Sequence, residues 1–328
     1  MKTSVYVIAE IGINHEGRIT DCLDMVSAAK ESGADAVKLQ IIDPEKCYAK
    51  KSESFRLFKS ASLARAEISE VFDFAKHCDV DIFATAGDIE TILWVDSLDP
   101  CGWKISSGLL THHEIIKCVV RLNRHVYVST GMADTNDIDD AVHLLSELPK
   151  KQCSLLHCRS IYPTPAQDIN LSRLAWLKAR YGMQVGYSDH SIESLTVPAA
   201  VALGAEVIEK HFTLDETRPG FDHHISFEPR KFRQMVDQIR EVECMLGVAE
   251  LTQDPEIEEV KRRMSRWVVA ARPLKIGHVV TEKDLEVKRP SKCNLNPIPP
   301  SNLESIVGRE LKNSYCQGEA LRFTEVTG

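Results

Sequence analysis

The chain lacks the features that mark nucleic-acid-binding and membrane-spanning proteins. Its 328 residues carry a formal net charge of −8. They contain no basic run and no stripe of interleaved basic and aromatic residues, which argues against nucleic acid as a partner. No apolar run approaches the length of a transmembrane helix, and no apolar segment typical of a signal peptide follows Met1. We therefore expect a cytoplasmic protein that binds neither nucleic acid nor a membrane.

A disulfide framework and a structural zinc site are also disfavoured, although the chain has ten cysteines. Their spacing is irregular and includes no Cys-x-x-Cys pair, and in a chain of this length several fall where apolar core residues belong. Reduced thiols are therefore expected at Cys22, Cys47, Cys78, Cys101, Cys118, Cys153, Cys158, Cys244, Cys293 and Cys316.

The sequence does contain a regular alternation of short apolar runs and longer amphipathic segments. The apolar runs predict eight strands, namely Val5–Glu10, Ala36–Gln40, Asp81–Thr85, Trp103–Ser106, His125–Ser129, Cys153–His157, Gln184–Ser188 and Glu206–Glu209. The amphipathic segments predict helices near residues 19–32, 64–78, 89–97, 112–122, 136–147, 171–181, 193–203 and 229–246. Gly33 and Gly204 each stand between a helix and the next strand, where a glycine commonly ends a helix.

An alternating series of about 250 residues is typical of a TIM (β/α)8 barrel. The strands are mostly continuous apolar runs, as expected where both faces of a parallel sheet are buried. An open doubly wound sheet is the alternative, but no Gly-x-Gly-x-x-Gly motif follows the first strand to support a dinucleotide-binding fold. The sequence thus predicts a TIM-barrel catalytic domain over residues 1–250.

The composition changes after the last predicted barrel helix. Residues 251–264 are dense in charge and predict a solvated linker that could be partly helical. Short strands are expected at Trp267–Ala270 and Leu285–Lys288, and the prolines between residues 290 and 300 exclude regular structure there. Residues 265–328 are therefore predicted to form a second, small, β-rich domain.

Polar residues stand at the end of every predicted strand, which is where a TIM barrel carries its active site. Lys38 and Lys104 follow apolar runs, so their ammonium groups would lie at the barrel mouth and require a negative partner. Binding of phosphate or carboxylate is one interpretation, and a Lys–Glu ion pair is the other. Side chains that could bind a substrate beside the lysines are Gln40, Thr85, Ser107, Ser129 and Ser188.

His190 and His211 follow the last two strands, which are neighbours in a barrel, so both imidazoles could hold one divalent metal ion. Glu10 ends the first strand, which also touches the last, and its carboxylate could act as a ligand, a base or a hydroxyl acceptor. His157 is expected to be a core histidine. A Schiff-base aldolase that uses the two lysines is an alternative in which the metal is superfluous.

Several segments resemble the signature of the sialic acid synthase (N-acetylneuraminate synthase) family. In chain order they are residues 8–17 (IAEIGINHEG), 33–40 (GADAVKLQ), 103–108 (WKISSG), 129–132 (STGM), 162–165 (YPTP), 186–190 (GYSDH), 209–215 (EKHFTLD) and 220–223 (GFDH). The tail, with residues 284–285 (DL) and 287–290 (VKRP), is similar to the antifreeze-like (SAF) domain that follows the barrel in that family.

The resemblance implies condensation of phosphoenolpyruvate with the open aldehyde form of an N-acylated hexosamine. The expected acceptor is N-acetylmannosamine or a related, bacillosamine-derived sugar, with or without a phosphate group. The product would be a nine-carbon 2-keto acid, and phosphate would be released. His190 and His211 would hold the divalent ion, Mn²⁺ by expectation with Mg²⁺ or Co²⁺ as alternatives, and with Glu10 they form the expected catalytic set. The expected substrate-binding set is Lys38, Gln40, Thr85, Lys104, Ser107, Ser129, Tyr162, Ser188, Asp222 and Arg289.

Within that set, Tyr162 and Asp222 would line the sugar site, and Arg289 would reach the sugar of a neighbouring subunit in a domain-swapped homodimer. The sequence also departs from the family pattern at three places. Leu109 stands where the family usually has glutamate, residues 85–88 (TAGD) stand where it reads Thr-Pro-Phe-Asp, and the loop at residues 43–62 is short. A second hypothesis is therefore a diverged, non-catalytic homologue that binds sugar or phosphoenolpyruvate.

Overall fold

A computed structural model of the chain describes residues 4–250, 254–292 and 296–326. Cys293, residues 251–253 of the predicted linker and residues 327–328 of the predicted second domain lie outside this part. The chain divides into two units, Met1–Gly247 and Val248–Gly328, and each unit is described by itself.

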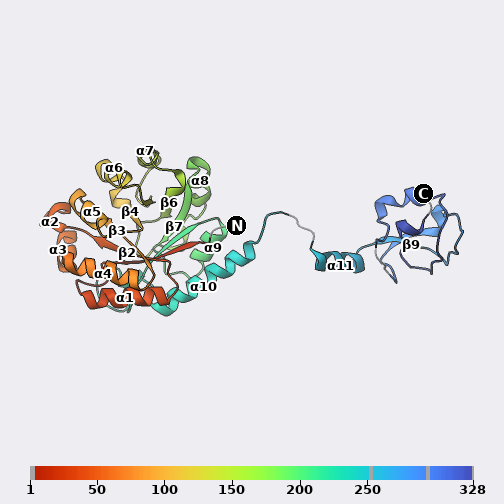
Figure 1. Cartoon of the computed structure of the whole chain (residues 1–328), viewed down its shortest axis with the longest axis horizontal. Helices are drawn as coiled ribbons and strands as arrows, with labels where there is room; N and C mark the ends of the chain where they lie inside the picture. Colours follow the sequence, from red (N-terminus) through yellow and green to blue (C-terminus); the bar gives the residue numbers. More distant parts are fainter. Residues whose placement is uncertain (1–3, 251–253, 293–295, 327–328) are drawn as a thin grey trace. The chain divides into compact units, whose positions relative to one another are not determined.

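Eight parallel strands form a closed barrel in the first unit, and the last strand pairs back to the first (Figure 1). The prediction of a TIM barrel is confirmed, and the open-sheet alternative is wrong. The strands are β1 (Tyr6–Gly12), β2 (Ala36–Ile41), β3 (Asp81–Ala86), β4 (Gly102–Ile105), β5 (His125–Ser129), β6 (Cys153–Cys158), β7 (Gln184–Asp189) and β8 (Val207–His211).

Helices follow the strands and surround the barrel (Figure 1). They are α1 (Ile19–Glu31), α4 (Arg65–His77), α5 (Ile89–Asp96), α6 (His113–Arg121), α7 (Thr135–Leu145), α8 (Arg173–Tyr181), α9 (Thr196–Ala202) and α10 (Pro229–Leu246). Each corresponds to a predicted helix. Gly33 and Gly204 adopt positive φ angles of 89° and 96°, a conformation that glycine adopts without a steric penalty.

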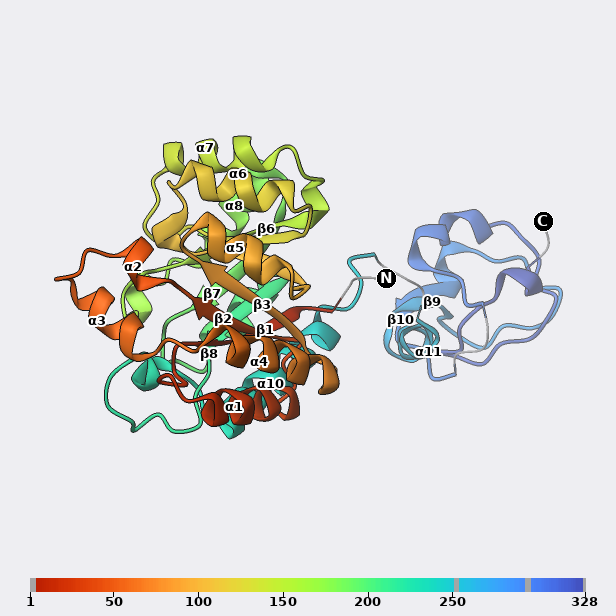
Figure 2. The same ribbon diagram turned by 60° about the vertical axis from the view of Figure 1, so that its left-hand side comes forward.

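Two short helices occupy the connection between β2 and α4, which the sequence did not predict to be helical. They are α2 (Pro44–Cys47) and α3 (Glu53–Ser60), and they lie together at one side of the barrel (Figure 2). The Asp43 side chain accepts a hydrogen bond from the Glu45 backbone N–H and caps α2, and Ser52 caps α3 in the same way. No residue of α3 is fully buried, so this helix is not part of the barrel core.

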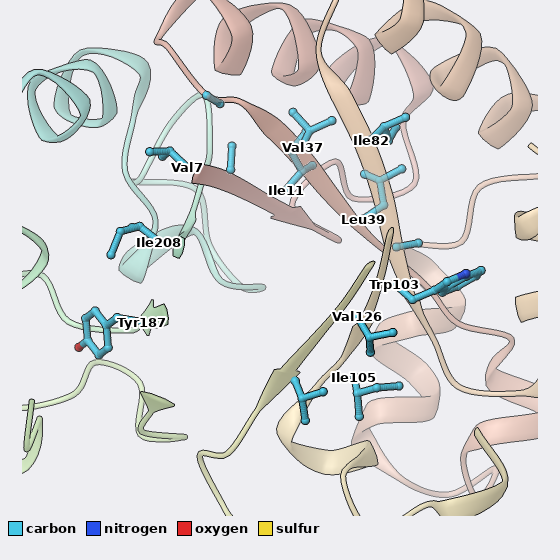
Figure 3. Packing of buried hydrophobic residues seen from close by; sticks show 14 of the residues in the cluster. Val7, Ile11, Val37, Leu39, Ile82, Trp103, Ile105, Val126, Tyr187 and Ile208 are labelled. Carbon is cyan, nitrogen blue, oxygen red and sulfur yellow. The ribbon is translucent and has the colours of Figure 1, made fainter. Parts of the chain in front are cut away.

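Side chains on each strand alternate between the helices and the barrel interior. The side chains that pack against the helices include Val7, Val37, Ile82, Trp103 and Ile208 (Figure 3). A separate apolar cluster fills the interior and consists of Ile8, Ala36, Phe83, Tyr127, Leu156 and Val207, with Tyr6 against it. Two residues further along their strands, the next interior positions hold Glu10, Lys38, Thr85, Ser129 and Glu209. The apolar cluster therefore forms the floor of a polar barrel mouth.

The second unit contains the antiparallel pair β9 (Trp267–Ala270) and β10 (Leu285–Lys288) and otherwise mainly turns and short 3-10 helices, as the sequence predicts. Its own core is built from Val268, Leu274, Val280, Ile298, Ile306, Leu311, Tyr315 and Leu321, among others. Helix α11 (Pro255–Met264) spans most of the predicted linker and has no buried residue.

Within the residues that the structure describes, no helix is long and apolar enough to span a membrane. The nine cysteines in this part of the chain are free thiols, and Cys22, Cys153 and Cys158 are buried. Their reduced state and a cytoplasmic location stay predictions.

Candidate active site

A cavity of about 340 Å³ opens at the C-terminal ends of the barrel strands. It brings together eleven of the predicted site residues, which are Glu10, Lys38, Gln40, Lys104, Ser107, Ser129, Tyr162, Ser188, His190, His211 and Asp222. Residues from all parts of the first unit therefore converge on one space, as the strand-end pattern predicts.

Two predicted residues do not line this cavity. Thr85 lines an adjoining cavity of about 420 Å³ that shares Gln40, Ser106 and Gly108 with the first. Arg289 is exposed in the second unit, directly after β10. Its reach towards a neighbouring subunit stays a prediction.

A buried ion network crosses the floor of the cavity and centres on Glu209. The Lys104 Nζ donates to both carboxylate oxygens of Glu209, at 2.7 Å and 2.9 Å. The Lys38 Nζ lies 3.3 Å from Glu209 Oε2 and 3.1 Å from Glu10 Oε2. Lys–Glu ion pairs are therefore present at both lysines, and they lie inside the candidate site.

The pKa values of the four charged groups in the network are shifted in different directions. Burial alone would raise the pKa of Glu209, but the two ammonium groups outweigh it and hold that pKa well below its usual range. Burial also raises the pKa of Glu10, and Lys38 offsets only part of this effect. The pKa of Lys38 is raised because the attraction of the two carboxylates exceeds its desolvation. Desolvation prevails at Lys104 and lowers its pKa.

Hydroxyl groups also line the cavity. Ser188 Oγ donates to Glu209 Oε1 at 2.7 Å, and Ser107 Oγ accepts from the Gly131 backbone N–H at 3.0 Å. A Cβ at position 131 would lie 2.6 Å from both Cys158 Sγ and Ser160 Oγ, so only glycine lets this turn approach so closely. Ser129 is buried on the same wall.

His190 and His211 lie side by side in the same cavity, with ring centroids 5.4 Å apart. Burial lowers the pKa of His190 to about 4. The pKa of His211 is also well below its usual value, because of its burial and the positive field of His190 and Lys38. Both imidazoles are therefore neutral at pH 7, which is the form that binds metal ions.

The histidine pair fits a divalent ion with few protein ligands. His190 Nδ1 lies 2.7 Å from the Arg159 backbone oxygen, which fixes a proton on that nitrogen and leaves Nε2 free to coordinate. His211 Nδ1 is buried and makes no hydrogen bond within the described chain. No group of three or more His, Cys, Asp or Glu side chains among the described residues is arranged to hold a metal. The remaining ligands would therefore have to come from substrate or water.

Tyr162 and Asp222 stand around the histidine pair, where the sequence places the sugar site. The Tyr162 ring lies 4.3 Å from the His190 ring between centroids. Asp222 Oδ2 lies 3.6 Å from His211 Nδ1, and burial raises the pKa of Asp222. Gln40 Nε2 donates to Glu10 Oε1 at 2.7 Å and so links this region to the ion network.

The structure also bears on two other polar residues, Glu209 and His157. The sequence analysis missed Glu209 as a site residue, because Glu209 was interpreted only as the polar residue that ends the predicted strand Glu206–Glu209. Its position two residues before His211 is the signal that could have found it, since the period of a strand puts both side chains on one face. The prediction for His157 is confirmed, because it is buried and lies 2.6 Å from the Ile169 backbone oxygen through Nε2.

Two family models match the chain. The model of the NeuB family matches residues 25–250, and the model of the SAF domain matches residues 265–327. The chain belongs to the NeuB family. This confirms the resemblance in the barrel, and the SAF match confirms it in the tail.

Relatives of this NeuB protein align with nearly its whole length. An uncharacterized protein of Methanocaldococcus jannaschii is 36% identical over 323 residues, which are 98% of this chain and 95% of that protein. The N,N'-diacetyllegionaminic acid synthase of Campylobacter jejuni is 31% identical over 336 residues, 96% of this chain and 98% of that enzyme. The crystal structure of N-acetylneuraminic acid (sialic acid) synthetase from Leptospira borgpetersenii is 31% identical and covers 80% of this chain and 92% of that chain, with a TM-score of 0.76.

Proposed function

We propose that this NeuB protein condenses phosphoenolpyruvate with the open-chain aldehyde of an N-acylated hexosamine to give a sialic-acid-type nine-carbon 2-keto acid, releasing phosphate. The observation that carries the proposal is one cavity that holds two buried lysines beside two neutral histidines. The relatives named as synthases of legionaminic acid and N-acetylneuraminic acid support the same reaction class.

The lysines explain why the first substrate would be a doubly anionic molecule. Lys38 and Lys104 are buried and both line the cavity. A buried ammonium group favours an anion beside it. Phosphoenolpyruvate has a phosphate and a carboxylate, and Lys38 and Lys104 with Ser107, Ser129 and Ser188 would hold them.

The histidines would serve the second substrate. His190 and His211 would hold the divalent ion, Mn²⁺ by preference, which supplies Lewis-acid polarisation of the aldehyde oxygen when bound. Tyr162, Asp222 and Gln40 would then orient the sugar. Arg289 of a neighbouring subunit would contact the same sugar in a domain-swapped homodimer.

Bond making needs one proton at the aldehyde oxygen and one water at the donor carbon. C3 of phosphoenolpyruvate attacks the aldehyde carbon, and the aldehyde oxygen takes a proton and becomes a hydroxyl group. Water then adds to C2, and phosphate leaves as the keto group forms. We propose that Glu10 provides the proton, because it lines the same cavity and its carboxyl group accepts a hydrogen bond from Gln40 Nε2, and because burial raises its pKa.

A phosphate-release assay tests the proposal. The protein is incubated with Mn²⁺, phosphoenolpyruvate and a panel of 2-acetamido sugars, and sugar-dependent phosphate release with a 2-keto acid product is expected. Binding of phosphoenolpyruvate without release for any sugar would instead favour the non-catalytic homologue. A Schiff-base aldolase would be trapped by borohydride with pyruvate and would be indifferent to a chelator.

A further inference from the structure

A further buried ion pair joins the ends of β7 and β8, next to the histidine pair. Asp189 is the last residue of β7, and Lys210 lies directly across from it in β8. Lys210 Nζ is 2.9 Å from Asp189 Oδ2, and both side chains are 0% exposed. Neither residue lines the cavity, whereas His190 and His211, the next residues along the chain, do. The ion pair therefore lies on the other face of the barrel wall, because successive side chains of a strand point to opposite faces.

Stability alone is a poor explanation for this pair. Among the ion pairs of the described residues, only this one and those of the Glu209 network have both side chains less than 5% exposed. Removing two charges from water is costly, and an apolar pair of similar volume is often as stable or more stable. A buried pair outside the cavity thus calls for a role other than holding the barrel together.

The Asp189 side chain builds the turn that carries His190. Asp189 Oδ1 accepts from the Ser191 backbone N–H at 2.9 Å and from the Tyr187 hydroxyl at 3.0 Å. A carboxylate that bonds the N–H two residues further on fixes the turn between them. The Thr164 backbone N–H also donates to the His190 backbone oxygen at 2.9 Å. The backbone on both sides of the His190 side chain is therefore held.

The Lys210 ammonium group links this turn to the backbone of His211. Lys210 Nζ donates to the backbone oxygen of Ser191, the residue directly after His190. It also lies 4.2 Å from the centroid of the Phe227 ring. The Phe227 backbone N–H in turn donates to the His211 backbone oxygen at 2.8 Å. One cation thus connects the two chain segments that carry the imidazoles.

A metal site with two protein ligands depends strongly on how those ligands are held. His190 and His211 would be the only side chains of this chain bound to the ion, so no third protein ligand can compensate for a shift of either ring. A site of this kind needs its ligands within about 0.5 Å of the productive geometry. The residues that orient the ligands therefore contribute to the affinity for the metal.

We propose that Asp189 and Lys210 are positioning residues that hold His190 and His211 at the separation needed to bind one divalent ion. The inference rests on the proposed function, in which the two histidines hold that ion. The ion pair touches neither the ion nor a substrate, and it acts through the backbone of Ser191 and of the histidines.

The double variant Asp189→Asn with Lys210→Met tests the inference. Asparagine keeps an oxygen acceptor for Ser191 and Tyr187, and methionine fills the space of the lysine without its charge. No unpaired charge is then left at this position, so we expect the barrel to fold. The Kd of Mn²⁺, measured from the electron paramagnetic resonance signal of the free ion, should rise at least about tenfold. The Kd of phosphoenolpyruvate without metal, measured by calorimetry, should stay as in wild type.

Two control variants separate positioning from charge and from stability. Lys178→Met makes the same substitution in the exposed ion pair with Glu206, just before β8, and should leave the Mn²⁺ affinity unchanged. Ile116→Ala removes a fully buried side chain of α6. It should lower the midpoint of thermal unfolding, because it leaves a cavity, without changing the Kd of Mn²⁺ below that midpoint.

A milder variant is available if the double variant does not fold. Tyr187→Phe removes only the hydroxyl that donates to Asp189. It should raise the Kd of Mn²⁺ about threefold, as expected for the loss of one hydrogen bond. An unchanged Kd in a folded Tyr187→Phe protein would then overturn the inference.

The remaining outcomes are distinguishable. If the double variant binds Mn²⁺ as tightly as wild type while His211→Ala does not, the inference is wrong and the proposed function stands. An equal loss of Mn²⁺ affinity in Ile116→Ala, or an equal loss of phosphoenolpyruvate affinity in the double variant, would assign the effect to general loosening and also refute positioning. A wild-type protein that binds no Mn²⁺ would defeat the metal site of the proposed function, and the inference with it.

Discussion

Replacing Glu209 with glutamine should destabilise the barrel strongly. In the wild-type protein this carboxylate lies 2.7 Å from Lys104 Nζ and 3.3 Å from Lys38 Nζ, and less than 5% of each side chain is exposed. Glutamine keeps the shape of the side chain but removes its charge. Glu10 then remains as the only carboxylate in contact with Lys38 among the described residues.

The size of the effect has a physical limit. Removing one partner of a buried ion pair costs about 3–5 kcal/mol. The variant can limit this loss if one buried lysine gives up its proton and becomes neutral. At pH 7, deprotonating a lysine with the ordinary pKa of about 10.4 costs about 1.4 kcal/mol for each pH unit between the two values, or roughly 4.6 kcal/mol in total. A loss of about 4 kcal/mol lowers the midpoint of thermal unfolding by about 8–16 °C in a barrel of this size.

The pH dependence provides a second signature. In the variant the unfolded chain binds more protons than the folded chain, because the unfolded lysine has its ordinary pKa. Stability of the variant relative to wild type therefore rises with pH, by about 1.4 kcal/mol per unit, until about pH 10. Inorganic phosphate should stabilise the variant more than the wild type, because it replaces the missing negative charge.

Thermal unfolding followed by circular dichroism measures these effects, and Glu206→Gln is the matched control. Glu206 stands just before β8 and contacts Lys178 at 2.8 Å, with side chains 35% and 51% exposed. An exposed pair of this kind contributes less than about 1 kcal/mol. The reasoning fails if Glu209→Gln unfolds at the same temperature as Glu206→Gln, or if phosphate stabilises wild type and Glu209→Gln equally.

Four further predictions concern the metal, the sugar, the donor and the second unit. His211→Ala should abolish metal-dependent turnover while circular dichroism shows a folded barrel, because half of the protein's hold on the ion is lost; full activity at saturating substrate would contradict this. Arg289→Ala should raise the KM of the sugar without changing that of phosphoenolpyruvate, and an unchanged sugar KM would remove the tail from the site. Phosphoenolpyruvate binding should take up protons at mildly alkaline pH, since an anion raises the depressed pKa of Lys104; calorimetry in two buffers would detect this, and equal heats after buffer correction would count against it. Asp284→Asn should destabilise the second unit near pH 7, because Arg272, His278 and Thr281 donate to the buried carboxylate and lower its pKa; this stabilisation is present above about pH 4 and lost as pH falls, so a gap between the unfolding midpoints that persists below pH 4 would argue against the assignment.

The barrel could be predicted because its signals are local. Each strand is an apolar run that is bounded by polar residues, so the ends of β1 to β8 fall within two residues of the prediction. Helices α2 and α3 were missed although Asp43 and Ser52 are typical capping residues, because the two helices span only four and eight residues and so give too few helical turns for a periodic pattern to stand out.

The site could be predicted only as a set of residues at strand ends. Glu209 was missed because a charge inside a strand is tolerated only when distant residues pair with it, and Lys38 and Lys104 come from β2 and β4. Thr85 was placed with the main site, yet it lines the adjoining cavity of about 420 Å³. The cavity that a strand-end side chain lines depends on the connecting segments, such as the one that contains α2 and α3. The sequence pattern does not predict where these segments lie.

A crystal structure with phosphoenolpyruvate and Mn²⁺, with anomalous data collected at the manganese edge, tests the central claim most directly. The account predicts one anomalous peak within coordination distance of both His190 and His211, and the phosphate held between Lys38 and Lys104. A manganese peak elsewhere, or a phosphate bound away from the two lysines, would contradict it.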